Sequence, residues 1–291
     1  MQVPVPFYRW VKVVANKIPY VEEYRQSVAW KIVRHRVALA IDERTNSGFT
    51  GFLRLPTQFE ALAGPVVKFV TETGTRSSLR IVVMGCSNGA EAYTAASILM
   101  ARCPHIELVI DAYDIDARTI EKARSARYRA DEVFNNKIIT AKFVEDTFDI
   151  DDDVYRVKEA LAARVRFFTA DVLNTDLQIQ VGKCDILFAQ NFLFHLDRKA
   201  AVRAFNNLCG LLNPRAVFFI DGMDIDLRRK GVMKHHLLPL DFRIEQIHNE
   251  ARRARAPGWP DRYWGLEPFM TFTSDWQRRY ATIYLKDGDR T

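Results

Sequence analysis

Residues 82–96, VVMGCSNGAEAYTAA, decide the fold, because they join a short apolar run to a helical segment through a loop with two glycines. Gly85 and Gly89 stand four residues apart, and glycine allows backbone amides to approach a ligand closely. A plain tight turn between a strand and a helix has the same pattern. The ends of the other predicted strands distinguish these two interpretations.

Short apolar runs without alternation recur along the chain, and helical segments lie between several of them. Such runs are typical of strands buried on both faces of a parallel sheet, and their alternation with helices indicates an α/β fold with right-handed crossovers. The predicted strands are 79–84, 108–113, 165–168, 185–188 and 216–220, and the predicted helices lie near 89–101, 116–126 and 197–212.

In such a sheet, ligands bind at the carboxyl ends of the strands, and four predicted strands end in a polar or glycine-containing turn. Gly85 follows the first strand and Asp114 the second, where a carboxylate can accept hydrogen bonds from both hydroxyls of a ribose. Asp171 follows the third strand, where it could meet an adenine amino group, and Asn191 follows the fourth. These four residues, at the ends of four successive predicted strands, together predict a site for a nucleoside-bearing cofactor. Asp116 stands where a helix N-cap would, which favours a structural role.

The sequence of the loop after the first strand indicates which of the common nucleoside cofactors fits this site. It does not match the GxGxxG pattern of dinucleotide-binding proteins and lacks the lysine of a P-loop, which argues against NAD and ATP. S-adenosylmethionine fits better, because it carries a ribose and an adenine but no phosphate that needs a helix N-terminus. S-adenosylmethionine is therefore the predicted cofactor.

Composition narrows the class of protein. The 291 residues are 48% hydrophobic and 27% charged, as in ordinary globular proteins. We expect no membrane insertion, since no apolar run reaches about 18 residues. The four cysteines are far apart, which favours a cytoplasmic protein without a disulfide framework or structural zinc. Basic clusters at 25–36 and 252–255 lack an accompanying RNA motif or zinc finger, so nucleic-acid binding is not predicted. Nothing in the sequence indicates an oligomeric state.

Four ordered motifs resemble those of the CheR-type methyltransferases, which methylate glutamates of chemotaxis receptors with S-adenosylmethionine. TGFLR at 50–54 resembles T-x-F-F-R, and GCSNGAEAY at 85–93 resembles C-S-T-G-E-E-P-Y. YDID at 113–116 and QNFLFHLD at 190–197 resemble T-D-I-D and R-N-V-L-I-Y-F-D. The resemblance implies a Rossmann-like class I methyltransferase with a mostly parallel seven-stranded sheet and helices on both faces. Residues 1–49 would form a short N-terminal helical region and residues 50–291 the methyltransferase domain.

The resemblance also implies roles for single residues. Thr50, Phe52 and Arg54 would close over the methionine end of the cofactor, with Arg54 near its carboxylate or near the acceptor. Glu91 would hold part of the methionine or ribose moiety. The Gly85–Gly89 turn would cradle the cofactor. Asp114 would bind the ribose hydroxyls, and Asp171 and Val172 would contact the adenine. Asn191 and Phe192 would lie beside the methionyl group.

One departure from the family pattern bears on the acceptor: His195 stands where the family has a tyrosine. A hydroxyl acceptor benefits from a general base and histidine titrates in the right range, whereas a carboxylate needs none. We therefore predict His195 and Arg54 as catalytic residues acting on an oxygen of a small-molecule or other non-receptor acceptor. The alternatives are a protein-glutamate methyltransferase of chemoreceptors and a non-catalytic cofactor-binding regulator. No metal site is predicted, because His235 and His236 are adjacent and point in different directions.

The segments outside the predicted strands leave alternatives open. Residues 56–73 look helical, although Pro65 must break or kink that helix. Residues 242–248 and 281–285 could be the closing pair of strands, but the first could equally be helical.

Residues 249–280 have no counterpart in the family pattern. They form either a loop that packs on the edge of the sheet or a lid in which Trp259, Tyr263 and Trp264 bind the acceptor.

Overall fold

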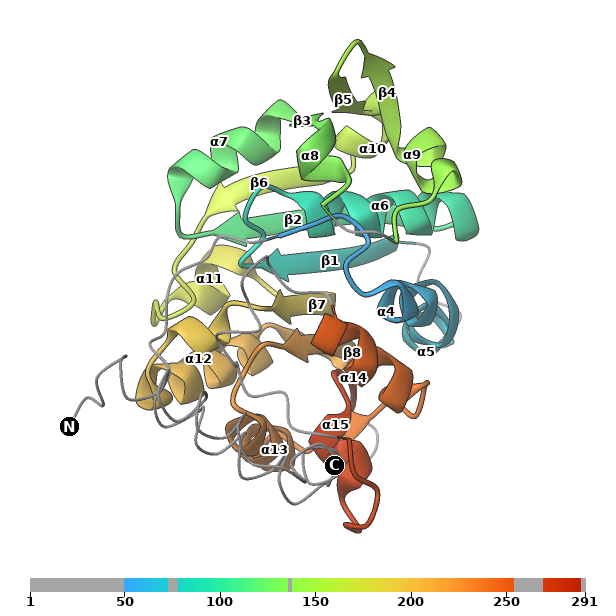
Figure 1. Ribbon diagram of the computed structural model, residues 1–291. Helices are drawn as coiled ribbons and strands as arrows, with labels where there is room; N and C mark the ends of the chain where they lie inside the picture. The colour runs from blue at the N-terminus through green and yellow to red at the C-terminus, as the bar shows by residue number, and fades with distance from the viewer. Residues whose placement is uncertain (1–49, 73–77, 136–137, 254–268, 289–291) are drawn as a thin grey trace, which may run out of the picture.

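The computed structural model describes residues 50–72, 78–135, 138–253 and 269–288. These residues contain a seven-stranded sheet with the order β6-β2-β1-β7-β8-β10-β9 (Figure 1). The pairs from β6 to β8 are parallel, and β10 is antiparallel to both of its neighbours. This arrangement confirms the predicted fold. The strands are β1 Ser78–Met84, β2 Glu107–Asp114, β6 Val165–Thr169, β7 Cys184–Gln190, β8 Leu212–Asp221, β9 Leu238–Pro239 and β10 Ile283–Asp287.

Helices cover both faces of this sheet, and each face has its own apolar core. Successive side chains of a strand point to opposite faces, so Ile81 and Val83 join one core while Val82 and Met84 join the other. Because both faces are buried, the strands read as continuous apolar runs. The first core includes α4 Pro56–Ala61, α5 Val67–Thr71, α6 Ala90–Arg102 and α7 Ala117–Ser125, and the second includes α11 Leu177–Val181, α12 Arg198–Gly210, α13 Ile225–Lys234 and α15 Trp276–Tyr280.

A second, three-stranded antiparallel sheet was missed by the sequence analysis. Its order is β3-β5-β4, and it projects beyond β6 and α7 (Figure 1). These strands are only three or four residues long, and the acidic run 149–153 resembles a solvated loop. The elements of this region are β3 Arg127–Arg129, α8 Ala130–Val133, α9 Ala141–Thr147, β4 Phe148–Asp151, β5 Val154–Val157 and α10 Glu159–Ala162.

The helix predicted at 56–73 is interrupted at Pro65, as expected. A π-helical segment, η1 Leu62–Val66, separates α4 from α5, and Gly64 within it has φ −117° and ψ −106°. Proline has no N–H to donate and its ring clashes with the preceding turn, so the regular hydrogen-bond ladder cannot continue through it.

The structure decides between the alternatives for the C-terminal part. Residues Ile244–Arg253 form helix α14, so the strand interpretation of 242–248 is wrong. The strand predicted at 281–285 is confirmed as β10, and β9 is its other partner. Within 249–280, the described residues 269–280 pack on the second core, where Phe269, Trp276 and Tyr280 form an aromatic cluster.

Some predictions fall outside the described residues. These include the helical region at 1–49 and the three acceptor-binding candidates Trp259, Tyr263 and Trp264. In the described ranges, no helix has the length and apolar character needed to cross a membrane.

Candidate active site

A cavity of about 320 Å³ lies at the carboxyl ends of β1, β2 and β7. The chain runs from β1 through β2 to β6 on one side, and from β7 to β8 on the other. The direction of strand addition therefore changes between β1 and β7, which is where open α/β sheets bind ligands. The cavity is lined by Thr50, Gly51, Arg54, Phe59, Gly85, Cys86, Ser87, Glu91, Asp114, Ile115, Asp116, Thr119, Gln190, Asn191, Phe192 and His195.

The turn after β1 requires glycine at both predicted positions. Gly85 has φ +74° and Gly89 has φ +86°, a region that other residues rarely adopt. A Cβ atom on Gly85 would lie 2.5 Å from the ring of Phe192, and one on Gly89 would lie 2.9 Å from the ring of Phe167. Gly85 lines the cavity, whereas Gly89 caps α6 behind it.

Asp114 is fixed at the end of β2 by two backbone amides. Its Oδ2 accepts a hydrogen bond from the Ser87 amide at 2.8 Å, and its Oδ1 accepts one from the Asp116 amide at 3.0 Å. A carboxylate has about four acceptor positions, so capacity for ligand hydroxyls remains. Asp116 accepts from the Arg118 amide at 2.9 Å and caps α7, which confirms its predicted structural role.

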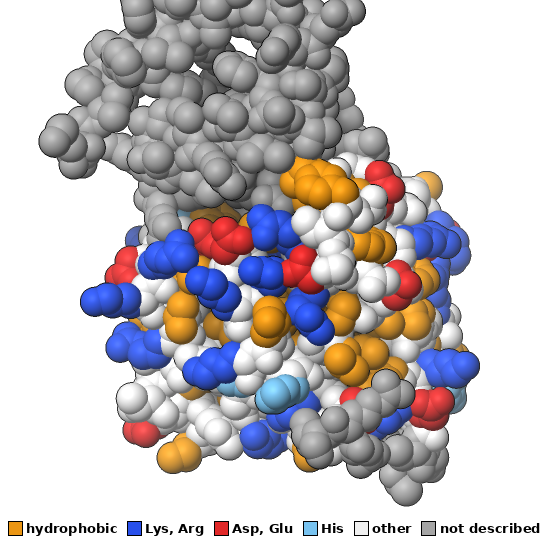
Figure 2. Space-filling view, turned by 90° about the horizontal axis from the view of Figure 1, so that it is seen from below, with side chains coloured by type: hydrophobic (Ala, Val, Ile, Leu, Met, Phe, Trp, Pro, Cys, Tyr) orange, Lys and Arg blue, Asp and Glu red, His pale blue; other side chains and the backbone are white. Residues whose placement is uncertain are grey.

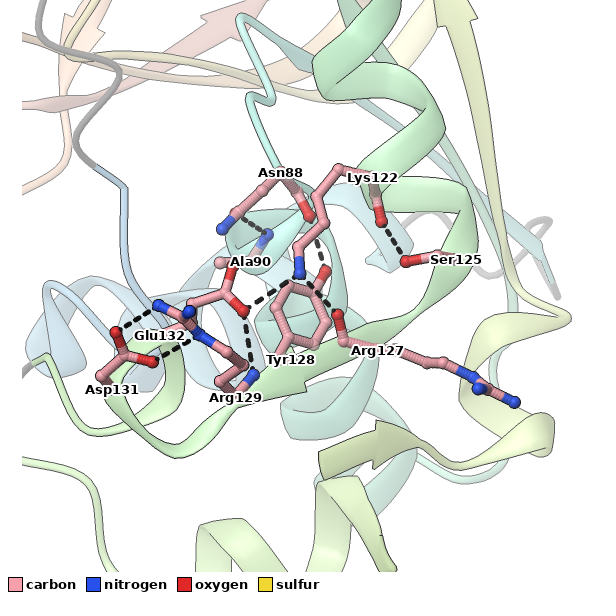
Figure 3. A network of polar contacts seen from close by, with 9 residues as sticks. All are labelled: Asn88, Ala90, Lys122, Ser125, Arg127, Tyr128, Arg129, Asp131 and Glu132. Carbon is pink, nitrogen blue, oxygen red and sulfur yellow. Dashed lines mark hydrogen bonds and ion pairs between the residues drawn. The ribbon is translucent and has the colours of Figure 1, made fainter. Parts of the chain in front are cut away.

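The small sheet holds the glycine turn from behind. The Tyr128 hydroxyl of β3 donates to the Asn88 carbonyl at 2.6 Å (Figure 3). The ammonium of Lys122 ties α7 to this region, because it contacts the Glu132 carboxylate at 3.0 Å and the Arg127 carbonyl at 2.9 Å. These contacts fix the position of the turn that forms one wall of the cavity.

The TGFLR segment reaches the cavity through a strained turn. Leu53 has φ +47°, and its amide donates to the Thr94 hydroxyl of α6 at 3.2 Å. Phe52 does not line the cavity; its fully buried ring packs 4.8 Å from Tyr128 and 5.0 Å from Phe148. Phe52 therefore anchors the segment, and the turn after it directs Arg54 to the ligand side.

Three charged groups interact in the buried part of the site. Burial raises the pKa of Glu91 to about 7; the Arg54 guanidinium opposes this shift and the Asp221 carboxylate adds to it. Burial lowers the pKa of Arg54, and the two carboxylates oppose that shift. Asp221 ends β8 and also lies 3.5 Å from Arg228.

The turn after β7 is held in a strained conformation. Asn191 has φ +61°, and its amide donates to the Asp221 carbonyl at 3.1 Å. A Cβ atom on Gly222 would lie 2.6 Å from the Asn191 Cα atom, so the two strand ends pack directly against each other. Strain of this kind persists only where the surroundings fix the backbone.

His195 ends the 3₁₀ turn Leu193–His195 and lines the cavity. Its Nδ1 atom is buried and has no hydrogen-bond partner among the described residues. Burial lowers the pKa of the imidazole, so the ring is mainly uncharged at neutral pH.

The family model for the CheR methyltransferase, SAM binding domain, matches residues 48–230, which is more than half of the chain. The chain belongs to the CheR methyltransferase family. Membership gives this CheR-family chain S-adenosylmethionine as its cofactor and confirms the resemblance seen in its motifs.

Individual relatives are similar at modest identity. The probable biofilm formation methyltransferase WspC of Pseudomonas aeruginosa is 27% identical over 71% of this chain and 48% of its own length. A chemotaxis protein methyltransferase of Borreliella burgdorferi is 27% identical over 59% of this chain and 60% of its own length. The CheR-family chain thus spans about half the length of these relatives. A structure of magnesium protoporphyrin IX methyltransferase (ChlM) from Synechocystis PCC 6803 with bound SAM covers 64% of this chain and 71% of that chain, at 16% identity and a TM-score of 0.36.

The charges of the CheR-family cavity fit S-adenosylmethionine. Among the described lining residues, Glu91, Asp114 and Asp116 are carboxylates, and Arg54 is a guanidinium. This cofactor carries a sulfonium and an ammonium, which favour carboxylates, and one carboxylate, which favours a guanidinium.

Two predicted adenine contacts lie outside the cavity lining. Asp171 is exposed and accepts from the Leu173 amide at 2.8 Å, and Val172 belongs to the second core. Several lining residues had no predicted site role, among them Ile115 and Gln190. Ile115 is an apolar side chain with 68% exposure directly after Asp114, a position that its sequence context could have indicated. Gln190 is fixed by Gln58, whose Oε1 accepts from its Nε2 at 2.7 Å, and no sequence signal marks a contact between residues so far apart.

Proposed function

We propose that this chain transfers the methyl group of S-adenosylmethionine to a carboxylate side chain of a protein, as a protein-glutamate O-methyltransferase of chemoreceptor-type signalling proteins. Similarity to chemotaxis protein methyltransferases and to WspC supports this acceptor class. The comparisons give no support to the small-molecule acceptor that the sequence analysis favoured.

The observation that carries the proposal is the place of Arg54 in the cavity. Among the described residues that line the cavity, Arg54 supplies the guanidinium group. Arg54 belongs to the motif that resembles T-x-F-F-R. A guanidinium binds a carboxylate through two parallel hydrogen bonds, which fixes the orientation of the carboxylate as well as its position. Arg54 can therefore orient either the acceptor or the methionine carboxylate.

The reaction needs orientation more than proton transfer. S-adenosylmethionine supplies an electrophilic methyl group when bound. Asp114 would hold the ribose hydroxyls, and Glu91 would accept hydrogen bonds from the ammonium. Arg54 would turn a lone pair of the acceptor carboxylate toward the methyl group. Positioning of this kind can contribute about 7–11 kcal/mol to a displacement between two bound groups. The carboxylate is already an anion, so His195 need not accept a proton.

A hydroxyl acceptor is the second candidate, and one observation favours it. His195 lines the cavity and its buried Nδ1 has no hydrogen-bond partner among the described residues, so a neutral imidazole could accept a proton from an alcohol bound there.

Alkaline release of the methyl group distinguishes these possibilities. The chain is incubated with cofactor labelled in the methyl group and with the cytoplasmic domains of candidate chemoreceptors, and the labelled protein is then treated with base. Methyl esters of carboxylates release volatile methanol, whereas methyl ethers of hydroxyls do not. Alkali-stable label would refute the carboxylate acceptor. Cofactor binding without turnover on any acceptor would instead indicate a non-catalytic regulator.

A further inference from the structure

Helix α12 carries a row of basic and apolar side chains on its exposed face. Lys199, Val202, Arg203 and Asn206 are spaced by three and four residues, so they lie along one side of the helix. Lys199, Val202 and Arg203 are exposed, and Val202 has 42% of its surface accessible.

Helix α13 carries a matching row, and the two rows meet. Lys230, Met233 and Lys234 are exposed and have the same spacing, and Met233 has 50% of its surface accessible. The ammonium of Lys234 donates to Oδ1 of Asn206 at 3.2 Å, which joins the row on α13 to the row on α12. We call the surface formed by Lys199, Val202, Arg203, Asn206, Lys230, Met233 and Lys234 the basic surface.

The cations of the basic surface form no close ion pair with a carboxylate of the described residues. In the part of the chain that the structure describes, no carboxylate pairs with Lys199, Arg203 or Lys230, and Lys234 contacts only the Asn206 amide. Neighbouring arginines differ, because Arg198 pairs with Asp224, Arg229 with Asp275 and Arg279 with Asp226. Figure 2 shows lysine and arginine side chains spread over the face of the molecule on the side of α13. Among the described residues, the four cations of the basic surface therefore form no close ion pair with a carboxylate, although Asp226 acts on Lys230 electrostatically from one turn away on α13.

The basic surface begins at the edge of the active site. Asp197 caps α12 and follows His195 by two residues, and Asp224 caps α13 and follows Asp221 by three residues. Both helices therefore start at the carboxyl edge of the sheet and lead away from the cavity. A protein with one carboxyl group in the cavity would extend along these two helices.

We propose that the basic surface docks an acidic helical segment of the acceptor protein. This inference rests on the proposed function, because that function requires a partner that carries glutamates. Carboxylates at helical spacing on the partner would match the cations of the two rows, and Val202 and Met233 would supply apolar contacts between them. An anionic membrane fits less well, because the basic surface has no aromatic side chain and only two large apolar ones.

The contribution of such a surface is collective and depends on salt. Single exposed ion pairs are weak and are screened within about 10 Å at 0.1 M salt. Complementary charges mainly increase the rate of encounter and fix the register of the partners. Reversing two of the four cations removes attraction and adds repulsion, so we expect binding to weaken by about tenfold or more at low salt.

The test uses a synthetic helical peptide with glutamates at every third and fourth position, and a peptide of the same composition in scrambled order. Binding is measured by fluorescence anisotropy for the parent chain, for Lys199→Glu/Arg203→Glu and for Lys230→Glu/Lys234→Glu. The control is Lys68→Glu/Arg102→Glu, which makes the same charge change on α5 and at the end of α6, at exposed residues that form no ion pair with the rest of the described chain. Vesicles rich in phosphatidylglycerol are the third probe. Calorimetry with the cofactor checks that each variant is folded.

Tenfold weaker binding of the helical peptide in both α12 and α13 variants, with the control within twofold of the parent, supports the proposal. The same loss should raise KM for an acceptor domain while kcat changes little. Equal binding by the variants and the control overturns it, as does preferential binding to vesicles or equal binding of both peptides. Peptide binding does not require turnover. A parent chain that binds the peptide but methylates no protein would therefore refute the proposed function and leave the docking surface supported.

Discussion

The affinity of this chain for S-adenosylmethionine should increase as the pH rises through about 7, and Glu91 should be the cause. Burial raises the pKa of Glu91 to about 7 in the ligand-free chain, so half of the molecules carry a protonated carboxyl at that pH. The ammonium of the cofactor favours the ionised carboxylate. Binding must therefore release a proton from the protonated fraction, and this cost grows as the pH falls.

The size of the effect follows from the ionised fraction of Glu91. With a pKa of about 7, roughly one tenth of Glu91 is ionised at pH 6 and about three quarters at pH 7.5, so affinity should rise about eightfold over this interval. Burial also lowers the pKa of His195, so the Glu91→Gln variant is needed to separate the contributions of the two groups.

Isothermal titration calorimetry with the cofactor tests this between pH 6 and 7.5, and buffers with different ionisation enthalpies report the released protons. Glu91→Gln keeps the size of the side chain but cannot titrate, so its affinity should be weaker at pH 7.5 and nearly independent of pH. A parent chain whose affinity is flat over this range would refute the reasoning. So would a Glu91→Gln variant that retains the full pH dependence.

Three further outcomes are expected. Asp114→Ala should weaken cofactor binding about tenfold or more in calorimetry, because hydrogen bonds to a charged group contribute roughly 1.5–3 kcal/mol; affinity within twofold of the parent would reduce Asp114 to a turn residue. His195→Phe should lower turnover of a protein carboxylate less than tenfold, whereas a hydroxyl acceptor predicts a loss of roughly 10²–10⁴-fold. Gly222→Ala should lower the free energy of unfolding by roughly 1–3 kcal/mol in chemical denaturation, because its φ of +63° and the 2.6 Å approach to Asn191 exclude a side chain; unchanged stability would show that the turn can relax.

The sheet and the cavity edge were predictable because each depends on a local pattern. Continuous apolar runs mark strands buried on both faces, and Gly85 and Asp114 lie at strand ends where every parallel sheet places its ligands. The N-cap role of Asp116 was predictable for the same reason, since a cap involves only the next two or three residues.

The parts that escaped prediction depend on contacts between distant residues. Phe52 belongs to a motif near the cofactor site, but its ring is buried by Tyr128 and Phe148 of a small sheet with no clear sequence signal. The buried side-chain hydrogen bonds from Gln190 to Gln58 and from Gln58 to Thr282 join three separate parts of the sequence. The small-molecule acceptor was predicted mainly from His195 and has no support from the comparisons, because a histidine indicates a base only if the acceptor carries a proton to remove.

Peptide mapping by mass spectrometry tests the central claim most directly. A candidate chemoreceptor domain is incubated with the chain and S-adenosylmethionine, digested at acidic pH to preserve esters, and fragmented to locate the added methyl group. The account predicts methyl groups on glutamate side chains, absent when Arg54→Ala replaces the parent chain and lost after treatment with base. Methyl groups on hydroxyl or nitrogen atoms, or no modification of any protein while a small-molecule alcohol is methylated, would contradict it.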